Sequence, residues 1–171
     1  MKAGSLILFA YLVLALEASL LYYFRIPFHA PDLGAIMAVY LGLNLQYVPA
    51  LLCALVIGFL QDGFAMGAPA GMHATALVII GLGAISLSSR VTFRSGIPVM
   101  VIAFIAALLS QAILFVLTAT FDQRVEDYGG FMDGWLVNGL VAAPFGPILF
   151  WLMQRASQFA DKRQKNRVFF Q

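Results

Sequence analysis

The chain has 171 residues, of which 62% are hydrophobic and 11% are charged, and its formal net charge is +2. A soluble domain is about 45–50% apolar, so this composition, with a mean hydropathy of +0.91, indicates a protein embedded in lipid. Five or six membrane spans would use nearly the whole sequence, which excludes an additional soluble catalytic domain or nucleic-acid-binding module. The single cysteine, Cys53, excludes an intramolecular disulfide.

The first predicted element is a helix over residues 3–24, whose only charged residue is Glu17. This apolar run is longer than the roughly 7–15 residues of a signal-peptide core and lacks a convincing cleavage site, so we expect a retained first span. An ionised, unpaired carboxylate inside a span is costly. Glu17 could therefore be protonated, be hydrated, or pair with Arg25, His29 or His73. The sequence alone leaves these alternatives open.

The next uncharged stretch is too long for one straight span. Residues 33–60 would rise about 42 Å as a single helix, against a hydrocarbon core of about 30 Å. The polar centre of this stretch, which ends in Pro49, favours a turn. The sequence therefore predicts two short spans, 33–45 and 48–61, joined by a tight hairpin. Asp32 is expected to cap the first of them.

The segment that follows the third span is chemically the most informative. It reads QDGFAMGAPAGMHA over residues 61–74 and carries Asp62 and His73 near its ends. Three glycines recur in it at intervals of four, but Pro69 interrupts a continuous helix, so we predict a compact turn with close backbone approach. For Asp62 we favour a structural role over direct contact with a partner.

Three further spans complete the predicted bundle. They cover residues 71–89, 96–120 and 132–154, and residues 155–171 form a basic tail. Gln111 and Asn138 are polar residues inside the last two spans, where hydrogen bonds between helices are expected. The predicted fold class is therefore an all-α integral membrane bundle of six transmembrane helices.

The basic residues predict the orientation of these spans. Six spans place every Lys and Arg except Arg25 and Arg124 on one side, so the positive-inside rule assigns both termini to the cytoplasm. A five-span model satisfies the rule equally well. The two models differ at Asp32 and Asp62, which lie on the same face with six spans and on opposite faces with five.

The motifs, taken in order, resemble those of the MreD family, the integral membrane subunit of the bacterial rod-shape system, or elongasome. The resemblance covers most of the chain and is strongest over residues 31–90. It is carried by Pro31-Asp32, VYL at 39–41, GFLQD at 58–62 and PAGMHATALV at 69–78. The positions that match the family motifs are Pro31, Asp32, Gly58, Asp62, Gly71 and His73.

The resemblance implies a non-enzymatic scaffold in the bacterial cytoplasmic (inner) membrane. Members of this family associate with MreC, and they act beside MreB, RodA and a class B penicillin-binding transpeptidase in lateral peptidoglycan synthesis. Their fold is similar to the six-helix S component of energy-coupling-factor transporters. The matching positions would then shape or line a partner-binding face. The resemblance leaves open whether the protein forms a homo-oligomer.

The residues themselves predict no catalytic set, no metal site and no cofactor. No serine has a His or Lys at a spacing that predicts a nucleophile and its base, Asp62 has no second aspartate within the spans, and the possible zinc ligands are scattered. The alternative function is that of an S component, a transporter subunit that encloses a vitamin-like ligand. The polar groups available for such a cavity would be Glu17, His73, Gln111 and Asn138.

Overall fold

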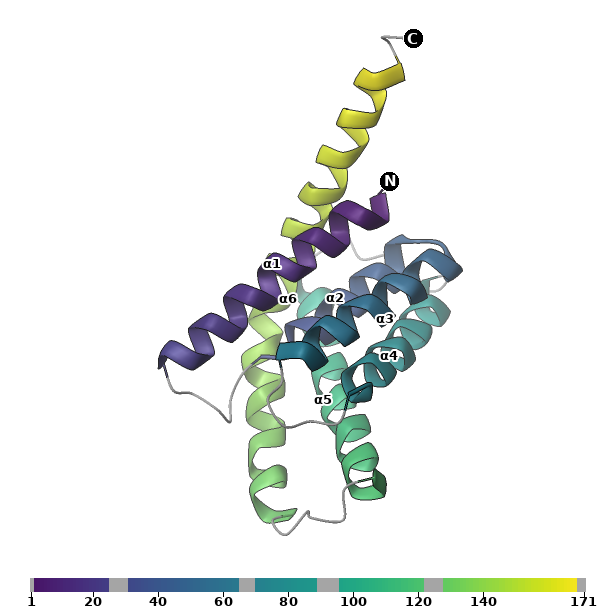
Figure 1. Ribbon diagram of the computed structural model, residues 1–171. Coiled ribbons are helices and arrows are strands. Elements are labelled where there is room, and N and C mark those ends of the chain that lie inside the picture. Colours follow the sequence, from purple (N-terminus) through teal and green to yellow (C-terminus); the bar gives the residue numbers. More distant parts are fainter. Residues whose placement is uncertain (1, 25–30, 65–69, 89–95, 122–127, 169–171) are drawn as a thin grey trace.

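The computed structural model describes residues 2–24, 31–64, 70–88, 96–121 and 128–168. Over these ranges the chain forms six helices and no strand, so the predicted all-α class is confirmed (Figure 1). The helices are α1 (Lys2–Phe24), α2 (Leu33–Asn44), α3 (Tyr47–Phe64), α4 (Met72–Ser88), α5 (Gly96–Phe121) and α6 (Tyr128–Val168).

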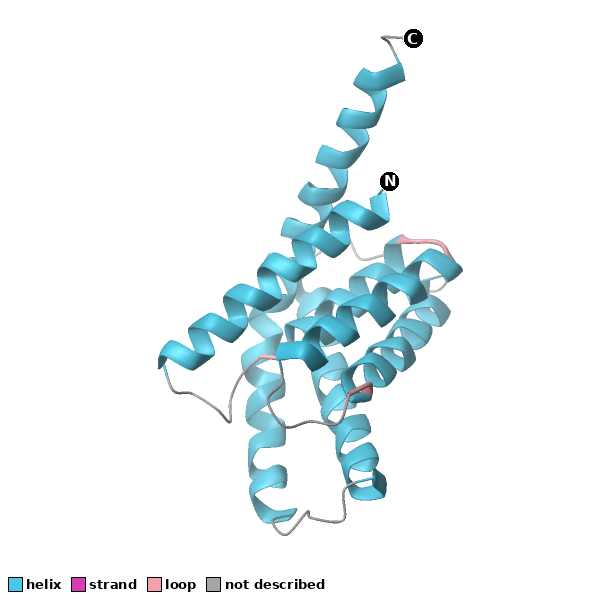
Figure 2. Cartoon of the chain, in the orientation of Figure 1, coloured by secondary structure: helices cyan, strands magenta, loops and turns pink. Residues whose placement is uncertain are grey.

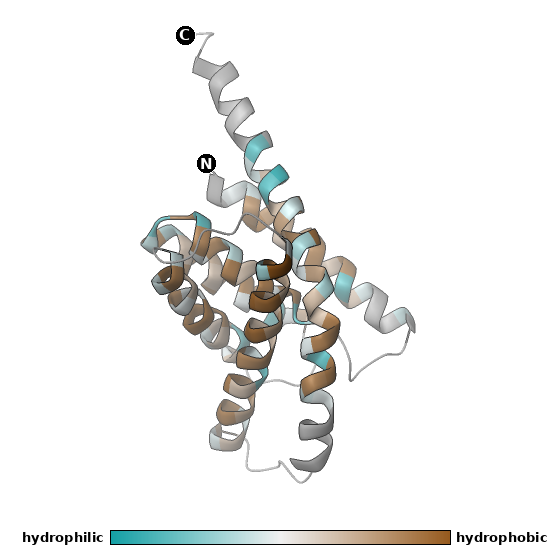
Figure 3. Ribbon diagram, turned by 180° about the vertical axis from the view of Figure 1, so that it is seen from behind, coloured by the Kyte–Doolittle hydropathy of each residue, from teal (hydrophilic) through white to brown (hydrophobic). Residues whose placement is uncertain are grey.

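Three stretches of helix in the described ranges are long and apolar enough to cross a membrane. They are Tyr47–Phe64, Gly96–Phe121 and Gly134–Gln158, which belong to α3, α5 and α6. Hydrophobic residues follow one another along the length of α5, and several of its large side chains, such as Val101 and Val116, are exposed (Figure 3). Such a surface is stable against lipid rather than water, so these helices indicate a membrane protein.

The predicted break in the second apolar stretch is present. The α2 helix ends at Asn44 and α3 begins at Tyr47, and between them Leu45 has an extended backbone with φ −108° and ψ 162°. Pro49 lies in the first turn of α3, where the N–H group that proline lacks has no partner within the helix. One long helix is therefore replaced by two antiparallel helices, as predicted.

The short helix α2 forms the centre of the bundle. Every residue from Leu33 to Gly42 is buried, and α2 packs against each of the other five helices. Small residues allow this close packing: a Cβ atom added to Gly42 would lie 2.7 Å from the Cβ atom of Ala84 on α4. With 12 residues α2 is only about 18 Å long, shorter than a hydrocarbon core.

The last helix, α6, continues without a break from the predicted sixth span into the segment predicted as a basic tail (Figure 1). Pro144 and Pro147 lie inside it. Neighbouring helices make such prolines tolerable in membrane helices, and here α5 packs closely, because a Cβ atom on Gly146 would lie 2.6 Å from the Cβ atom of Ala103.

Candidate functional site

Asp32 links the start of α2 to two other helices. Its Oδ1 atom accepts a hydrogen bond from the backbone N–H of Ala35 at 3.0 Å, the predicted cap, and a second from Nε2 of Gln61 on α3 at 3.2 Å. Its Oδ2 atom accepts a hydrogen bond from the hydroxyl of Ser110 on α5. Asp32 and Ser110 are both buried. We call Asp32, Gln61 and Ser110 the Asp32 cluster.

A glycine on α2 makes room for this cluster. A Cβ atom at Gly34 would lie 2.1 Å from Oε1 of Gln61 and 3.3 Å from a methyl group of Leu77. The Gln61 amide therefore occupies the space that a side chain at position 34 would fill. Its Oε1 atom is buried and has no hydrogen-bond partner in the described part of the chain.

Glu17 on α1 lies beside the Asp32 cluster. Its partly buried carboxyl group is close enough to Asp32 for an electrostatic interaction, and the backbone N–H of Leu33 faces it. Among the predicted alternatives, pairing with His73 is not observed, because the His73 ring contacts Asp62. Arg25 and His29 lie outside the described residues.

Asp62 organises the turn between α3 and α4. Its carboxylate accepts hydrogen bonds from the backbone N–H groups of Gly71 at 2.8 Å and His73 at 2.9 Å, with a longer contact of 3.4 Å to that of Ala74. It also lies 2.8 Å from Nδ1 of the His73 ring. These N–H groups belong to the first turn of α4, where no partner exists within the helix, so Asp62 caps α4 from a neighbouring helix.

Gly58, one of the motif positions, brings α3 and α4 into contact. A Cβ atom there would lie 2.3 Å from Cα and 2.7 Å from the backbone nitrogen of Ala74. Because these are backbone atoms, no side-chain rotation can relieve the clash. Gly58 therefore lets α3 approach the start of α4 closely enough for Asp62, one turn later, to reach it. Gly71 adopts φ +99°, a conformation that suits glycine.

The two aspartates lie at the same end of the bundle. Gln61 and Asp62 are consecutive on α3, and the first contacts Asp32 while the second contacts Gly71 and His73. Figure 2 shows the loops before α2 and α4 at one end, and the turn between α2 and α3 at the other. The chain turns back between α2 and α3, and both aspartates therefore lie on one side of the bundle. Pro31, the first residue of this site, accepts a hydrogen bond from the Leu33 N–H.

The polar residues predicted inside the last two spans do not join either cluster. Gln111 is partly buried on α5 next to Ser110. Oδ1 of Asn138 is buried without a hydrogen-bond partner among the described residues. The hydrogen bond observed between α5 and α6 runs instead from Nε1 of Trp135 to the carbonyl of Leu108, at 2.9 Å.

Sequence reasoning missed the roles of Ser110, Gln61 and Gly34. Ser110 is 78 positions from Asp32, and nothing in its neighbourhood marks it as a partner. Gln61 belongs to the GFLQD motif at residues 58–62. Its position next to Asp62 was the one sequence feature that could have indicated a role at this site.

The arrangement holds backbone segments in place rather than assembling reactive groups. The Asp32 and Asp62 carboxylates both accept hydrogen bonds from donors within the chain. Among the described residues no group of three or more His, Cys, Asp or Glu side chains could hold a metal ion. The observed hydrogen bonds hold the described residues at the starts of α2 and α4.

Comparison with known proteins adds no relative. No family model matches the chain, no curated protein matches it, and no solved structure matches it. The two clusters and the motif residues that form them are therefore the observations on which a function can be proposed.

Proposed function

We propose that this protein is an MreD-type scaffold subunit of the bacterial rod-shape complex, which binds MreC in the inner membrane and supports lateral peptidoglycan synthesis. The observation that carries the proposal is the meeting of two motifs at one end of the bundle. Pro31-Asp32 and the segment 58–73 are joined there through Gln61 and Asp62. We call residues 31–34, 61–64 and 70–73 together the motif platform.

The hydrogen bonds beneath the motif platform favour a scaffold. Asp32 and Asp62 are bonded inside the chain, and the Asp62 side chain is only 4% exposed, so neither is presented to a substrate. Their bonds hold residues 31–35 and 71–73 in a defined shape. A surface ordered before binding loses less conformational entropy when a partner docks.

The exposed residues of the motif platform suit a membrane-anchored partner. Gly63, Phe64 and Ala70 are exposed, and none is charged. In the six-span orientation with cytoplasmic termini, this end faces the periplasm. A protein with one span and a large periplasmic part, such as MreC, would contact it where its span leaves the lipid. MreB, RodA and the class B transpeptidase belong to the wider complex in this proposal.

Site-directed crosslinking tests the proposal. Cysteines introduced at Gly63 and Ala70 are expected to crosslink to co-expressed MreC, while a cysteine at Gln46, exposed at the opposite end, serves as the matched control. The native Cys53 is buried. Equal crosslinking from Gln46 and Gly63, or none from either platform position, would contradict the proposed binding face.

The structure offers less support for the alternative transport function. One cavity has a volume of about 230 Å³ and is lined by Asn44 and Leu45, at the turn between α2 and α3 and so opposite to the motif platform. Small-molecule sites usually measure about 300–1,000 Å³. Glu17, His73, Gln111 and Asn138, the polar groups predicted for a vitamin-like ligand, are not among its lining residues. Co-purification with an ATPase module and a tightly bound small molecule would nevertheless favour transport over the scaffold.

A further inference from the structure

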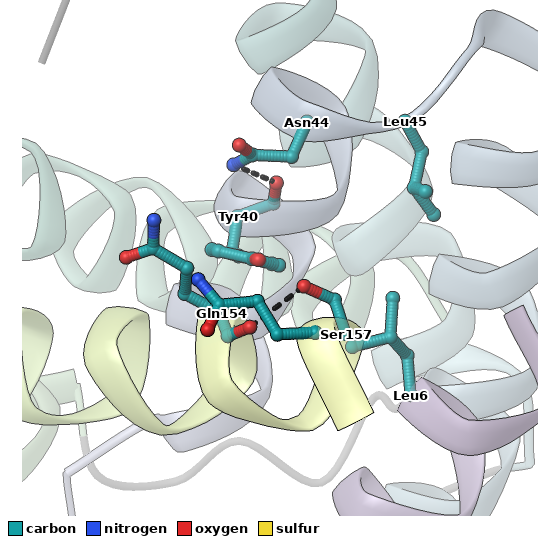
Figure 4. Close-up of a pocket in the computed structure, with 7 residues that line it drawn as sticks. Leu6, Tyr40, Asn44, Leu45, Gln154 and Ser157 are labelled. Atoms are coloured by element: carbon teal, nitrogen blue, oxygen red, sulfur yellow. Dashed lines mark hydrogen bonds between the residues drawn. The ribbon is translucent and has the colours of Figure 1, made fainter. Parts of the chain in front are cut away.

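A cavity of about 230 Å³ lies between α1, α2 and α6, at the end of the bundle that holds the turn between α2 and α3 (Figure 4). Leu6, Tyr40 and Leu45 supply its apolar side. Asn44, Gln154, Ser157 and Gln158 supply its polar side. The proposed scaffold function uses none of these residues.

The polar side of the cavity is rich in hydrogen-bond donors and has no acidic group. The Asn44 amide donates one bond to the Tyr40 carbonyl at 2.9 Å, and the Ser157 hydroxyl donates to the Gln154 carbonyl at 2.8 Å. Each amide NH₂ group has two hydrogens, so Asn44 keeps a second donor, and two glutamine amides stand beside it. These donors can bind a ligand that presents acceptor oxygens, and no lining carboxylate would repel an anion.

The surroundings of the cavity match the depth of lipid headgroups. Trp151 on α6 is exposed, and the Arg155 guanidinium lies 5.6 Å from the centre of its ring. Tryptophan and arginine gather at the boundary between hydrocarbon and headgroups. Beyond this point the sequence of α6 is strongly basic, with Lys162, Arg163 and further cations. A basic segment attracts anionic lipids.

The same helices offer apolar surface next to the cavity. Leu8 on α1 and Ile148 on α6 are exposed large hydrophobic residues, two and six positions from the nearest lining residues of their helices. Acyl chains can lie against such residues while a headgroup fills the polar space. A soluble phosphoester would leave this apolar surface uncovered, which favours a lipid as the source of the acceptor oxygens.

We propose that this cavity binds the phosphodiester headgroup of an anionic glycerophospholipid from the cytoplasmic leaflet. At roughly 30 Å³ per water molecule, the volume equals that of about seven or eight waters, which suits a phosphate with its glycerol. The Asn44, Gln154 and Gln158 amides donate to the phosphate oxygens, and the nearby basic segment supplies the electrostatic attraction. This site is independent of MreC binding, and it rests on the proposed orientation only in assigning the lipid to the cytoplasmic leaflet.

Lipid binding to the full-length chain tests the proposal. The protein is purified in detergent, stripped of lipid and titrated with phosphatidylglycerol, and native mass spectrometry counts the bound molecules. Ser157→Phe fills the cavity, and Ser86→Phe adds the same ring at an exposed serine on α4 as a matched control. Gln154→Leu keeps the side-chain volume and removes the donors. Thermal unfolding checks that each variant is folded.

We expect one tightly retained phosphatidylglycerol per wild-type chain, unchanged in Ser86→Phe. In Ser157→Phe and Gln154→Leu we expect binding about tenfold weaker, which corresponds to about 1.4 kcal/mol. Equal retention in all four proteins would overturn the proposal. If glycerol 3-phosphate in solution competes as well as the lipid, the site takes a free phosphoester, and the assignment to lipid is wrong.

Discussion

The Nε2 atom of Gln61 donates a hydrogen bond to Oδ1 of Asp32 at 3.2 Å, across 29 positions of the sequence. The next residue, Asp62, accepts hydrogen bonds from the first turn of α4. Two consecutive side chains at the end of α3 therefore hold the starts of two other helices. A change at this point of α3 is expected to affect the whole motif platform.

Asp62→Asn should lower the stability of the protein. An amide NH₂ group would replace one acceptor oxygen and face the N–H groups of Gly71 or His73, which leaves partly buried donors unpaired. We expect the free energy of unfolding to fall by about 1–3 kcal/mol, measured as an earlier thermal transition in detergent. His73→Ala removes only the ring contact, so its loss should be smaller. A wild-type transition for Asp62→Asn would show that the cap contributes little.

Gly58→Ala should separate α3 from α4. The new Cβ atom would lie 2.3 Å from Cα of Ala74, so the helices must move apart. Overpacking of this kind costs about 1–3 kcal/mol. The matched control is Gly83→Ala on α4, where nothing lies within 4 Å, and alanine there is expected to stabilise the helix by up to about 1 kcal/mol. Thermal unfolding that does not distinguish the two variants would refute the close contact.

Gly34→Ala should act through Gln61. The Cβ atom would meet Oε1 of the Gln61 amide, which is the far end of a flexible side chain, so the side chain turns away and the bond to Asp32 is lost. We expect a loss of about 1 kcal/mol in unfolding free energy, as for one hydrogen bond. In a double-mutant cycle with Gln61→Ala, the second substitution should cost clearly less than it does alone. Strict additivity would mean that the two positions are independent.

Glu17→Gln should leave the stability unchanged or raise it. Glutamine has the size of glutamate and carries no charge, so it fills the same space beside Asp32 without repelling its carboxylate. The thermal transition in detergent is the measurement, with Glu17→Ala as the comparison that removes most of the side chain as well. A large loss in Glu17→Gln would instead indicate that Glu17 pairs with a cation.

Labelling with a membrane-impermeant maleimide tests the orientation. A cysteine at Gly63 should react from the periplasmic side of intact cells, and a cysteine at Gln46 should react only after the membrane is opened, because the two positions lie at opposite ends of the bundle. Labelling of both positions in intact cells is incompatible with the six-span orientation.

Local features of the sequence predicted much of this fold. The spacing of charges and the length of the apolar runs predicted the helices, and the polar turn before Pro49 predicted the break between α2 and α3. The cap formed by Asp32 was also predictable, because its acceptor lies only three residues from the donor at Ala35. Hydrophobicity, turn preference and capping act over one or two turns of chain, so they can be recognised without a structure.

Packing alone decided how these elements meet. Ser110 is bonded to Asp32 across 78 positions, and Gly58 contacts the backbone of Ala74, although neither residue is marked by its neighbours in sequence. Asn138 was expected to form a hydrogen bond between helices from its polarity alone. Its buried Oδ1 atom has no hydrogen-bond partner among the described residues. Which helix faces touch depends on the shapes of all the side chains between them. The sequence therefore determined the helices and the cap of α2, and the tertiary structure decided the cap of α4 and which residues form the platform.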